Sequence, residues 1–112
     1  MSFDQWTIVV VPFPFTDRDT HKRRPALVLS NRGDLGAQAG HSVMAMITSA
    51  AHSRWPLDVV LSDRETAGLP APSLVRMKLF TLDDRLVLRQ LGTLSDHDRE
   101  ATRRALKRLL DR

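Results

Sequence analysis

A cationic cluster stands directly before an apolar, β-prone segment near the start of the chain. The cluster is His21-Lys22-Arg23-Arg24, and residues 25–30, which follow it, read Pro-Ala-Leu-Val-Leu-Ser. The planar guanidinium of Arg24 matches the oxygens of a phosphate and can stabilise negative charge that develops in a transition state. A buried strand would hold such a side chain in place better than a free loop. The pattern predicts phosphate chemistry at this junction, and the alternative is an arginine that only keeps a loop solvated.

Two further kinds of group could take part in such chemistry. Thr48 and Ser49 end an apolar segment, and a hydroxyl there could donate to a phosphoryl oxygen or hold a ribose hydroxyl. Threonine is also common in strands for its β-propensity alone, so both interpretations stay open. His21 could exchange a proton near neutral pH beside Arg24, or it could be a solvated loop imidazole.

Other kinds of site are excluded by residue type and spacing. The chain has no cysteine, and its histidines, at positions 21, 41, 52 and 97, lack the spacing of a zinc site. Neither a glycine-rich phosphate loop nor a Ser-His-Asp order is present. We therefore expect chemistry that uses no metal and no cofactor.

The bulk composition is that of one small basic domain, residues 1–112. The net charge is +4 and the isoelectric point is near 10.6, which favours a polyanionic partner such as a nucleic acid, although many small basic proteins bind none. No signal peptide or membrane span is recognisable and cysteine is absent, so we expect a cytoplasmic location and no membrane association.

The elements that must position these residues are short strands and one terminal helix. We expect strands over residues 7–15, 25–30, 43–48, 57–61, 74–82 and 86–91. Ser95 should cap the terminal helix, and a helical turn should begin at Ser62 and end at Gly68. Residues 31–41 indicate a flexible surface loop. Together these elements predict a small, strongly curved sheet or barrel closed by a helix.

Side-chain alternation indicates which faces are covered. Residues 43–48 are mostly apolar on both sides, so one face should be core and the other a subunit interface. Residues 74–82 place Arg76 and Lys78 opposite apolar neighbours, which predicts a wet, basic face. The apolar stripe of the terminal helix comprises Ala101, Ala105, Leu106, Leu109 and Leu110.

Three apolar segments end in or begin with distinctive residues. They are Ile8-Val9-Val10-Val11-Pro12-Phe13-Pro14-Phe15, Arg24-Pro25-Ala26-Leu27-Val28-Leu29-Ser30 and Met46-Ile47-Thr48-Ser49. Together they resemble the MazF/PemK family of toxin ribonucleases, and the likeness extends to about Leu110. The resemblance implies a mainly β (α+β) fold, a small SH3-like β-barrel with a C-terminal helix, in a homodimer. It also implies the toxin of a type II toxin-antitoxin system, an endoribonuclease that cleaves single-stranded RNA at selected sequences without a metal and is neutralised by a cognate antitoxin.

Carried over by position, the resemblance implies a catalytic pair, Arg24 and Thr48, and we choose His21 as the tentative general base. The expected RNA contacts are Lys22, Arg23, Ser49, Arg76 and Lys78. The implied reaction is attack of a ribose 2′-hydroxyl on the adjacent phosphate, which leaves a 2′,3′-cyclic phosphate and a 5′-hydroxyl.

Two departures from the family pattern bear on this activity. Trp6-Thr7 stands where members usually have Gly-Asp, and Lys78 stands where some have an acidic residue that can serve as a base. Activity could therefore be weak, altered in sequence preference or absent. Trp6 and Trp55 could each stack on bases or anchor a core or an interface.

Two other functions remain open. One is a non-catalytic growth inhibitor on the same fold, like the gyrase-poisoning CcdB toxins, whose hydrophobic C-terminal tail is not matched by Leu109-Leu110-Asp111-Arg112. The other is a nucleic-acid-binding barrel that contacts phosphates and leaves RNA intact. If the chain does cleave RNA, residues 17–23 and 50–56 should set its sequence preference.

Overall fold

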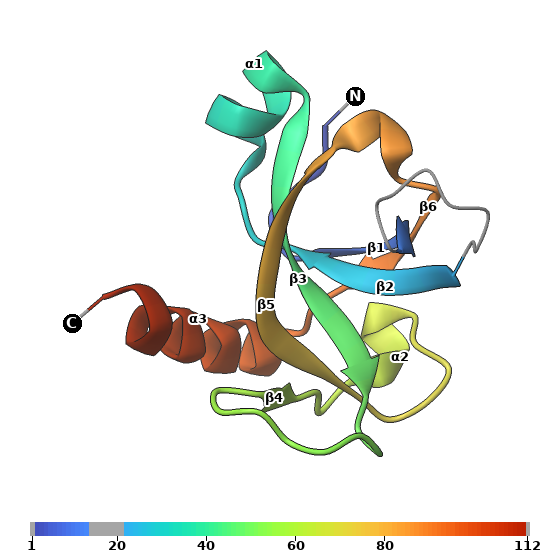
Figure 1. Ribbon diagram of the computed structural model, residues 1–112, viewed down its shortest axis with the longest axis vertical. Helices are drawn as coiled ribbons and strands as arrows, with labels where there is room; N and C mark the ends of the chain where they lie inside the picture. Colours follow the sequence, from blue (N-terminus) through green and yellow to red (C-terminus); the bar gives the residue numbers. More distant parts are fainter. Residues whose placement is uncertain (1, 14–21, 112) are drawn as a thin grey trace.

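The computed structural model describes residues 2–13 and 22–111, which form a curved half-barrel with a C-terminal helix (Figure 1). The described strands make one antiparallel sheet in the order β4-β5-β3-β2-β1-β6. Their bounds are β1 Thr7–Phe13, β2 Lys22–Val28, β3 His41–Ser49, β4 Val59–Val60, β5 Ser73–Asp83 and β6 Arg89–Thr93. The helices are α1 Ala37–Ala39, α2 Arg64–Ala67 and α3 Asp96–Leu110, with a π-helical turn η1 at Arg32–Gly36 and a 3-10 turn η2 at Asp84–Leu86. The predicted mainly β fold with a C-terminal helix is confirmed.

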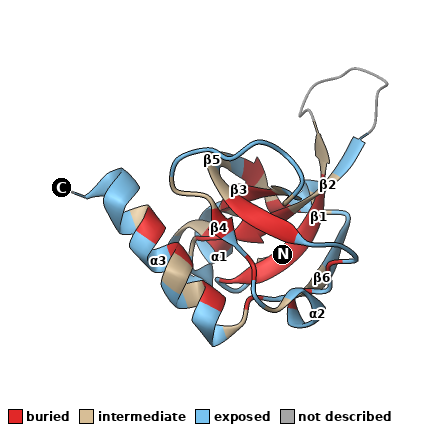
Figure 2. Ribbon diagram, turned by 90° about the horizontal axis from the view of Figure 1, so that it is seen from below, coloured by how far each residue is buried: buried red, intermediate tan, exposed pale blue. Residues whose placement is uncertain are grey.

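The sheet curls far enough that both faces of its central strands are buried (Figure 2). Ile8 and Ile47 belong to one apolar cluster, which α3 joins through Ala105. Val9 and Met44 belong to a second cluster on the opposite face. Met44 is completely buried by this chain itself. The second face of β3 is therefore covered within the monomer, which corrects the expectation that a partner subunit covers it.

A break in strand pairing bends β5, the longest strand. Ala45 pairs with Leu79 and the next residue of β3 pairs with Arg76, which leaves Met77 and Lys78 as extra residues of β5. A bulge of this kind bends a strand and re-aims its side chains. Met77 and Leu79 pack against the first cluster, whereas Arg76 and Lys78 line a hollow in the surface. The predicted basic character of this side is confirmed, but it is wet only at Lys78, because the Arg76 side chain is 12% exposed.

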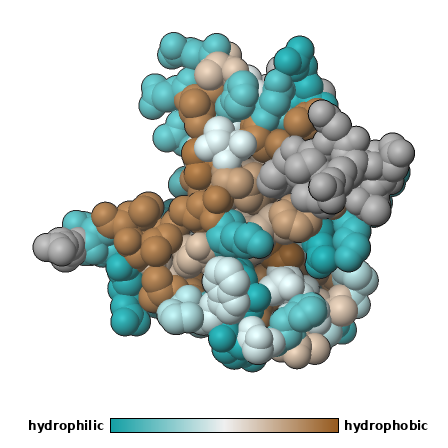
Figure 3. All heavy atoms as spheres, in the orientation of Figure 1, coloured by the Kyte–Doolittle hydropathy of each residue, from teal (hydrophilic) through white to brown (hydrophobic). Residues whose placement is uncertain are grey.

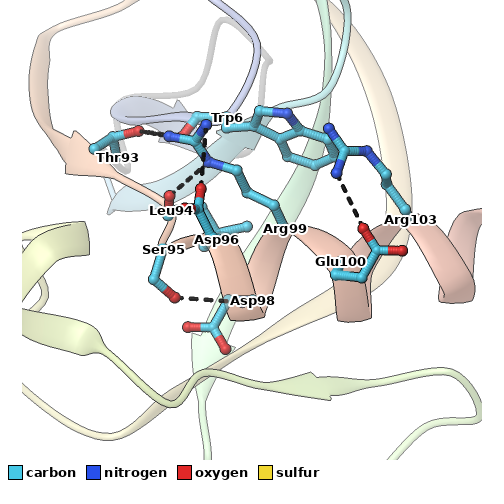
Figure 4. A network of polar contacts seen from close by, with 9 residues as sticks. All are labelled: Trp6, Thr93, Leu94, Ser95, Asp96, Asp98, Arg99, Glu100 and Arg103. Carbon is cyan, nitrogen blue, oxygen red and sulfur yellow. Dashed lines mark hydrogen bonds and ion pairs between the residues drawn. The ribbon is translucent and has the colours of Figure 1, made fainter.

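Helix α3 is fastened at its N-terminus (Figure 4). The Ser95 hydroxyl accepts a hydrogen bond from the Asp98 backbone N–H at 3.3 Å, which confirms the predicted cap. The Asp98 residue is only 1% exposed. Its carboxylate accepts hydrogen bonds from the Ser62 N–H, the Ser62 hydroxyl and the Asp63 N–H at 2.9–3.2 Å. Asp98 therefore clasps α3 to the turn before α2, a role that the sequence patterns do not indicate.

The middle and the C-terminal end of α3 pack differently. Near the middle of the helix, Arg103 lies 5.1 Å from the centre of the Trp6 ring, and Trp6 itself is 3% exposed within the first cluster (Figure 4). Trp6 is therefore a core anchor. The last two members of the predicted apolar stripe, Leu109 and Leu110, are exposed. Hydrophobic side chains gather over the outer end of α3 (Figure 3).

Two helical segments differ from the predictions. Residues 31–41, expected as a flexible loop, contain η1 and α1, and the Asn31 side chain caps η1. Asp63 rather than Ser62 caps α2, by accepting from the N–H three residues further on at 3.1 Å. Ser62 instead donates hydrogen bonds to Asp98 of α3. Gly68 ends α2 with a φ of +72°, as predicted.

The strand bounds also differ in places. The predicted strand over residues 57–61 is reduced to Val59–Val60, and η2 occupies the start of the predicted sixth strand. The second strand begins earlier, at Lys22, so Lys22, Arg23 and Arg24 belong to β2 rather than to a loop. Residues 14–15 of the first predicted strand lie outside the described residues. Within the described ranges, no helix is long and apolar enough to cross a membrane.

Candidate active site

A hollow of about 230 Å³ opens where β1, β2, β3 and β5 meet the loop that follows β3. We call it the central hollow, and its lining residues are Phe13, Arg24, Met46, Ile47, Thr48, His52, Trp55, Arg76 and Lys78. Because Ala26 of β2 pairs with Met46 of the antiparallel β3, the register carries Arg24 beside Thr48. The sheet thus brings the two residues of the predicted catalytic pair into one hollow.

Two cations meet over one aromatic ring in this hollow. The guanidinium carbon of Arg24 lies 5.9 Å from the centre of the Phe13 ring, and Nζ of Lys78 lies 5.5 Å from the same centre. Within residues 2–13 and 22–111, neither cation forms an ion pair with a carboxylate. The central hollow therefore presents concentrated positive charge, which favours a phosphate.

Arg76, by contrast, has its charge compensated by a buried carboxylate. Its Nε and Nη2 donate to the two oxygens of Asp58 at 3.2 and 3.0 Å, and the side chains are only 12% and 3% exposed. Burial alone would raise the pKa of Asp58. The hydrogen bonds from Arg76 and from the Trp55 N–H, with the positive charges of Arg76 and Arg54, outweigh burial and hold this pKa below its usual value of 3.8.

The other predicted RNA contacts lie around the central hollow. Arg23 and Ser49 line a neighbouring hollow of about 240 Å³, which shares Arg24 and Thr48 with the central one. The Ser49 hydroxyl accepts from the Ala51 N–H at 3.2 Å. Lys22 is exposed at the start of β2. His21, the predicted base, lies outside the described residues, so its place relative to the hollow stays a prediction.

The central hollow also contains His52 and Trp55, both in the loop that follows β3. The sequence analysis assigned neither of them to the site, although it noted that Trp55 could stack on bases. The available signal was the prediction that residues 50–56 help to set the sequence preference, but no spacing rule tied this loop to Arg24. Lys78, noted as a departure from the family pattern, lies in the hollow itself.

Among the described residues, no group of three or more histidine, cysteine, aspartate or glutamate side chains is arranged to hold a metal ion. The central hollow is lined by guanidinium, ammonium, hydroxyl and imidazole groups.

Residues 4–110 match the family described as PemK-like, MazF-like toxin of type II toxin-antitoxin system. The chain belongs to this family. The resemblance that three sequence segments indicated is thereby confirmed. No curated protein gives a significant sequence match to the chain.

Solved structures of MazF toxins share the fold of this family member. MazE-MazF from Deinococcus radiodurans matches with a TM-score of 0.76 at 27% identity, over 98% of this chain and 97% of that chain. An endoribonuclease from Mycobacterial species in complex with its cognate antitoxin matches with a TM-score of 0.74 at 17% identity, over 97% and 93%. Toxin MazF-mt6 from Mycobacterium tuberculosis matches with a TM-score of 0.72 at 23% identity, over 94% of this chain and 96% of that chain. The last two identities are low, so these two structures show a common fold.

Proposed function

We propose that this chain is a metal-independent endoribonuclease that cleaves single-stranded RNA and acts as the toxin of a type II toxin-antitoxin pair. The observation that supports this most strongly is the meeting of Arg24 and Thr48 in one hollow with a second cation, Lys78, that has no ion-pair partner among the described residues. Membership of the toxin family and structural neighbours described as endoribonucleases support the same function.

In the proposed reaction, a ribose 2′-hydroxyl attacks the adjacent phosphorus and the 5′-oxygen leaves. The bond from phosphorus to the 5′-oxygen breaks as the bond to the 2′-oxygen forms, and the leaving 5′-oxygen takes a proton from the solvent. The products are a 2′,3′-cyclic phosphate and a 5′-hydroxyl, so the step consumes no water. The guanidinium of Arg24 stabilises the charge that grows on the phosphoryl oxygens, with Lys78 as a second cation. The Thr48 hydroxyl donates to one of these oxygens and fixes the phosphate in line for attack.

The proton of the attacking 2′-hydroxyl requires an acceptor, and the proposal assigns this role to a histidine. His21 is the choice from sequence, and His52 is the histidine that lines the described hollow. Separate His21→Gln and His52→Gln variants distinguish the two. The variant that lacks the base loses activity and also loses the acid-side limb of the pH–rate profile, whereas the other keeps the wild-type profile.

The RNA strand would continue from the central hollow into the neighbouring one. Arg23 and Ser49 line that second hollow and Lys22 is exposed beside it on β2, so these three groups would contact flanking phosphates or riboses. Arg76 was predicted as a direct RNA contact. Its engagement by Asp58 supports a different role, in which it holds the wall of the hollow.

We further propose that the toxin acts as a homodimer in the cytoplasm and is inhibited by an acidic, partly disordered antitoxin that covers Arg24 and Lys78. The positive charge of the hollow suits such a partner. The mycobacterial neighbour in complex with its cognate antitoxin supports this arrangement. Light scattering of the purified chain tests the dimer. A toxin-antitoxin complex that still cleaves RNA at the full rate would contradict the covering of the hollow.

The function itself is tested by incubating purified protein with long single-stranded RNA in EDTA. We expect discrete fragments that end in 2′,3′-cyclic phosphate, and no cleavage where a 2′-deoxyribose replaces the attacking ribose. Thr48→Ala should lose most activity, while Arg104→Ala, which removes an exposed arginine on α3, should keep it. Cleavage that requires a divalent metal, or that persists at a 2′-deoxyribose, would contradict the proposed mechanism.

A further inference from the structure

The loop between β3 and β4 is held to β5 through its backbone. Besides pairing with Arg76, the Asp58 carboxylate accepts from the Trp55 N–H at 2.8 Å. Arg76 in turn donates from Nη2 to the Ser53 carbonyl at 2.7 Å. One buried ion pair thus fixes two points of the loop to a strand of the sheet. The loop is therefore positioned before any ligand arrives.

Trp55 is the side chain that this arrangement presents. The guanidinium carbon of Arg76 lies 4.7 Å from the centre of the Trp55 ring, which supports the ring through a cation–π contact. The residue nevertheless remains 46% exposed and lines the central hollow. A rigid, exposed aromatic loses little conformational entropy when a flat ligand stacks on it. Trp6, the other tryptophan, is buried in the core and cannot serve this purpose.

The charges around Trp55 indicate what the flat ligand would be. Arg24 and Lys78 lie across the same hollow, so an anion bound by them would be a close neighbour of the indole ring. A planar ring attached to a phosphate is a nucleotide, and aromatic side chains beside cationic grooves are the usual way in which proteins hold single-stranded bases.

We propose that Trp55 is a preformed stacking platform for one nucleobase of the RNA, next to the phosphate held by Arg24 and Lys78. Trp55 thereby contributes affinity for the nucleotide at that position of the cleavage site. Asp58 and Arg76 are positioning residues that hold the platform. This inference rests on the proposed function and adds a recognition element to it.

The test measures binding of a short single-stranded RNA made with 2′-O-methyl riboses, which lacks the attacking hydroxyl and stays intact. Tryptophan emission and the dissociation constant are recorded for the wild type and for Trp55→Ala, Trp55→Phe and Leu86→Ala. Leu86→Ala is the matched control, because Leu86 is 48% exposed and lies outside the central hollow.

We expect the RNA to quench wild-type emission, since Trp6 is buried and Trp55 is exposed. Trp55→Ala should bind roughly 5- to 150-fold more weakly, the range that loss of one base–aromatic stack implies. Trp55→Phe should retain most of the affinity while losing the quench. Leu86→Ala should match the wild type in both readouts.

The positioning residues are tested with Asp58→Ala, which removes both carboxylate oxygens that accept from Arg76 and from the Trp55 N–H. This variant keeps Trp55 but frees its loop, so the emission of the free protein should become less polarised and the dissociation constant should rise. The quench at saturating RNA should persist, because the ring is still present. A loss of affinity without any change in polarisation would overturn the positioning role.

The platform is overturned if Trp55→Ala binds as tightly as Leu86→Ala, or if saturating RNA leaves wild-type emission unchanged. Cleavage of unmodified RNA by the same proteins separates this result from failure of the proposed function. If the wild type cleaves RNA and Trp55→Ala shows the same KM and kcat, the inference fails and the proposed function stands. If the wild type neither binds nor cleaves RNA, both fail together.

Discussion

The clasp made by Asp98 predicts a large difference in stability between two neighbouring carboxylates. Asp96 and Asp98 both lie in the first turn of α3, where a negative charge favours the helix N-terminus. The Asp96 side chain is fully exposed, whereas Asp98 is buried and bonded to the Ser62–Asp63 turn. Replacing each by alanine removes the same charge from the helix, but only Asp98→Ala removes the clasp.

The magnitudes follow from the groups that each change leaves behind. Asp96→Ala loses about 0.3–1 kcal/mol of helix-terminus interaction and regains up to about 0.7 kcal/mol of helix propensity, so the free energy of unfolding should stay nearly constant. Asp98→Ala leaves two backbone N–H groups and a hydroxyl without their charged acceptor. At about 1.5–3 kcal/mol for each bond to a charged group, less what water restores at the exposed Ser62, we expect a loss of about 2–4 kcal/mol.

The assay is urea unfolding followed by tryptophan emission, to which the buried Trp6 contributes. One fixed protein concentration is used because association would shift the transition. In thermal unfolding, the same loss of about 2–4 kcal/mol corresponds to a fall in Tm of roughly 8–16 °C for a domain of this size. Asp98→Asn should be intermediate, since an amide can still accept from an N–H and can donate to the Ser62 hydroxyl. Equal stability of Asp96→Ala and Asp98→Ala would refute the reasoning.

Three further predictions concern packing, acid and salt. A Cβ at Gly92 would lie 2.3 Å from the carbonyl oxygen of Thr66, so Gly92→Ala should lower the free energy of unfolding by about 3 kcal/mol. At Gly40 no atom lies within 4 Å of an added Cβ, so Gly40→Ala should lower it by about 1 kcal/mol, and urea unfolding compares the two variants. Because folding depresses the pKa of Asp58, the contribution of its charge to the free energy of unfolding should be present above pH 3.8 and lost as pH falls through the depressed value. The difference in stability between the wild type and Asp58→Asn should therefore close in acid, and a difference that widens would contradict the ion pair. In titrations with single-stranded RNA at several salt concentrations, Lys78→Ala should reduce the slope of log K against log salt by about 0.7, and an unchanged slope would exclude a phosphate contact.

The strands and the terminal helix were predictable because they are local patterns. Residues 25–30 and 43–48 carry continuous apolar side chains, and Ser95 precedes an amphipathic run with acids in its first turn. These signals depend on residues close together in sequence. The helical turns within residues 31–41 were missed because glycine-rich composition favours a loop, and the cap from Asn31 outweighed that preference.

The candidate site was predictable only in part, since its geometry depends on distant segments. Arg24 and Thr48 were candidates by residue type, and the family resemblance implied that they are a catalytic pair. The pairing of β2 with β3 brings them together. The bulge that aims Lys78 into the hollow depends on the register between β3 and β5, which single-sequence alternation does not specify. Trp55 is held there by Asp58 through a bond between a side chain and a backbone N–H, a contact that no residue pattern encodes.

The proposed activity is tested most directly by comparing kcat for RNA cleavage by the wild type and by Arg24→Ala in EDTA, with Arg104→Ala as the matched loss of one positive charge. If Arg24 stabilises the charge of the transition state, Arg24→Ala should lower kcat by about 10²- to 10³-fold, while Arg104→Ala stays near the wild-type rate. Both variants should unfold cooperatively, so that the comparison reports on chemistry. Equal kcat for the wild type and Arg24→Ala would contradict the account, because the activity would then not arise in the central hollow.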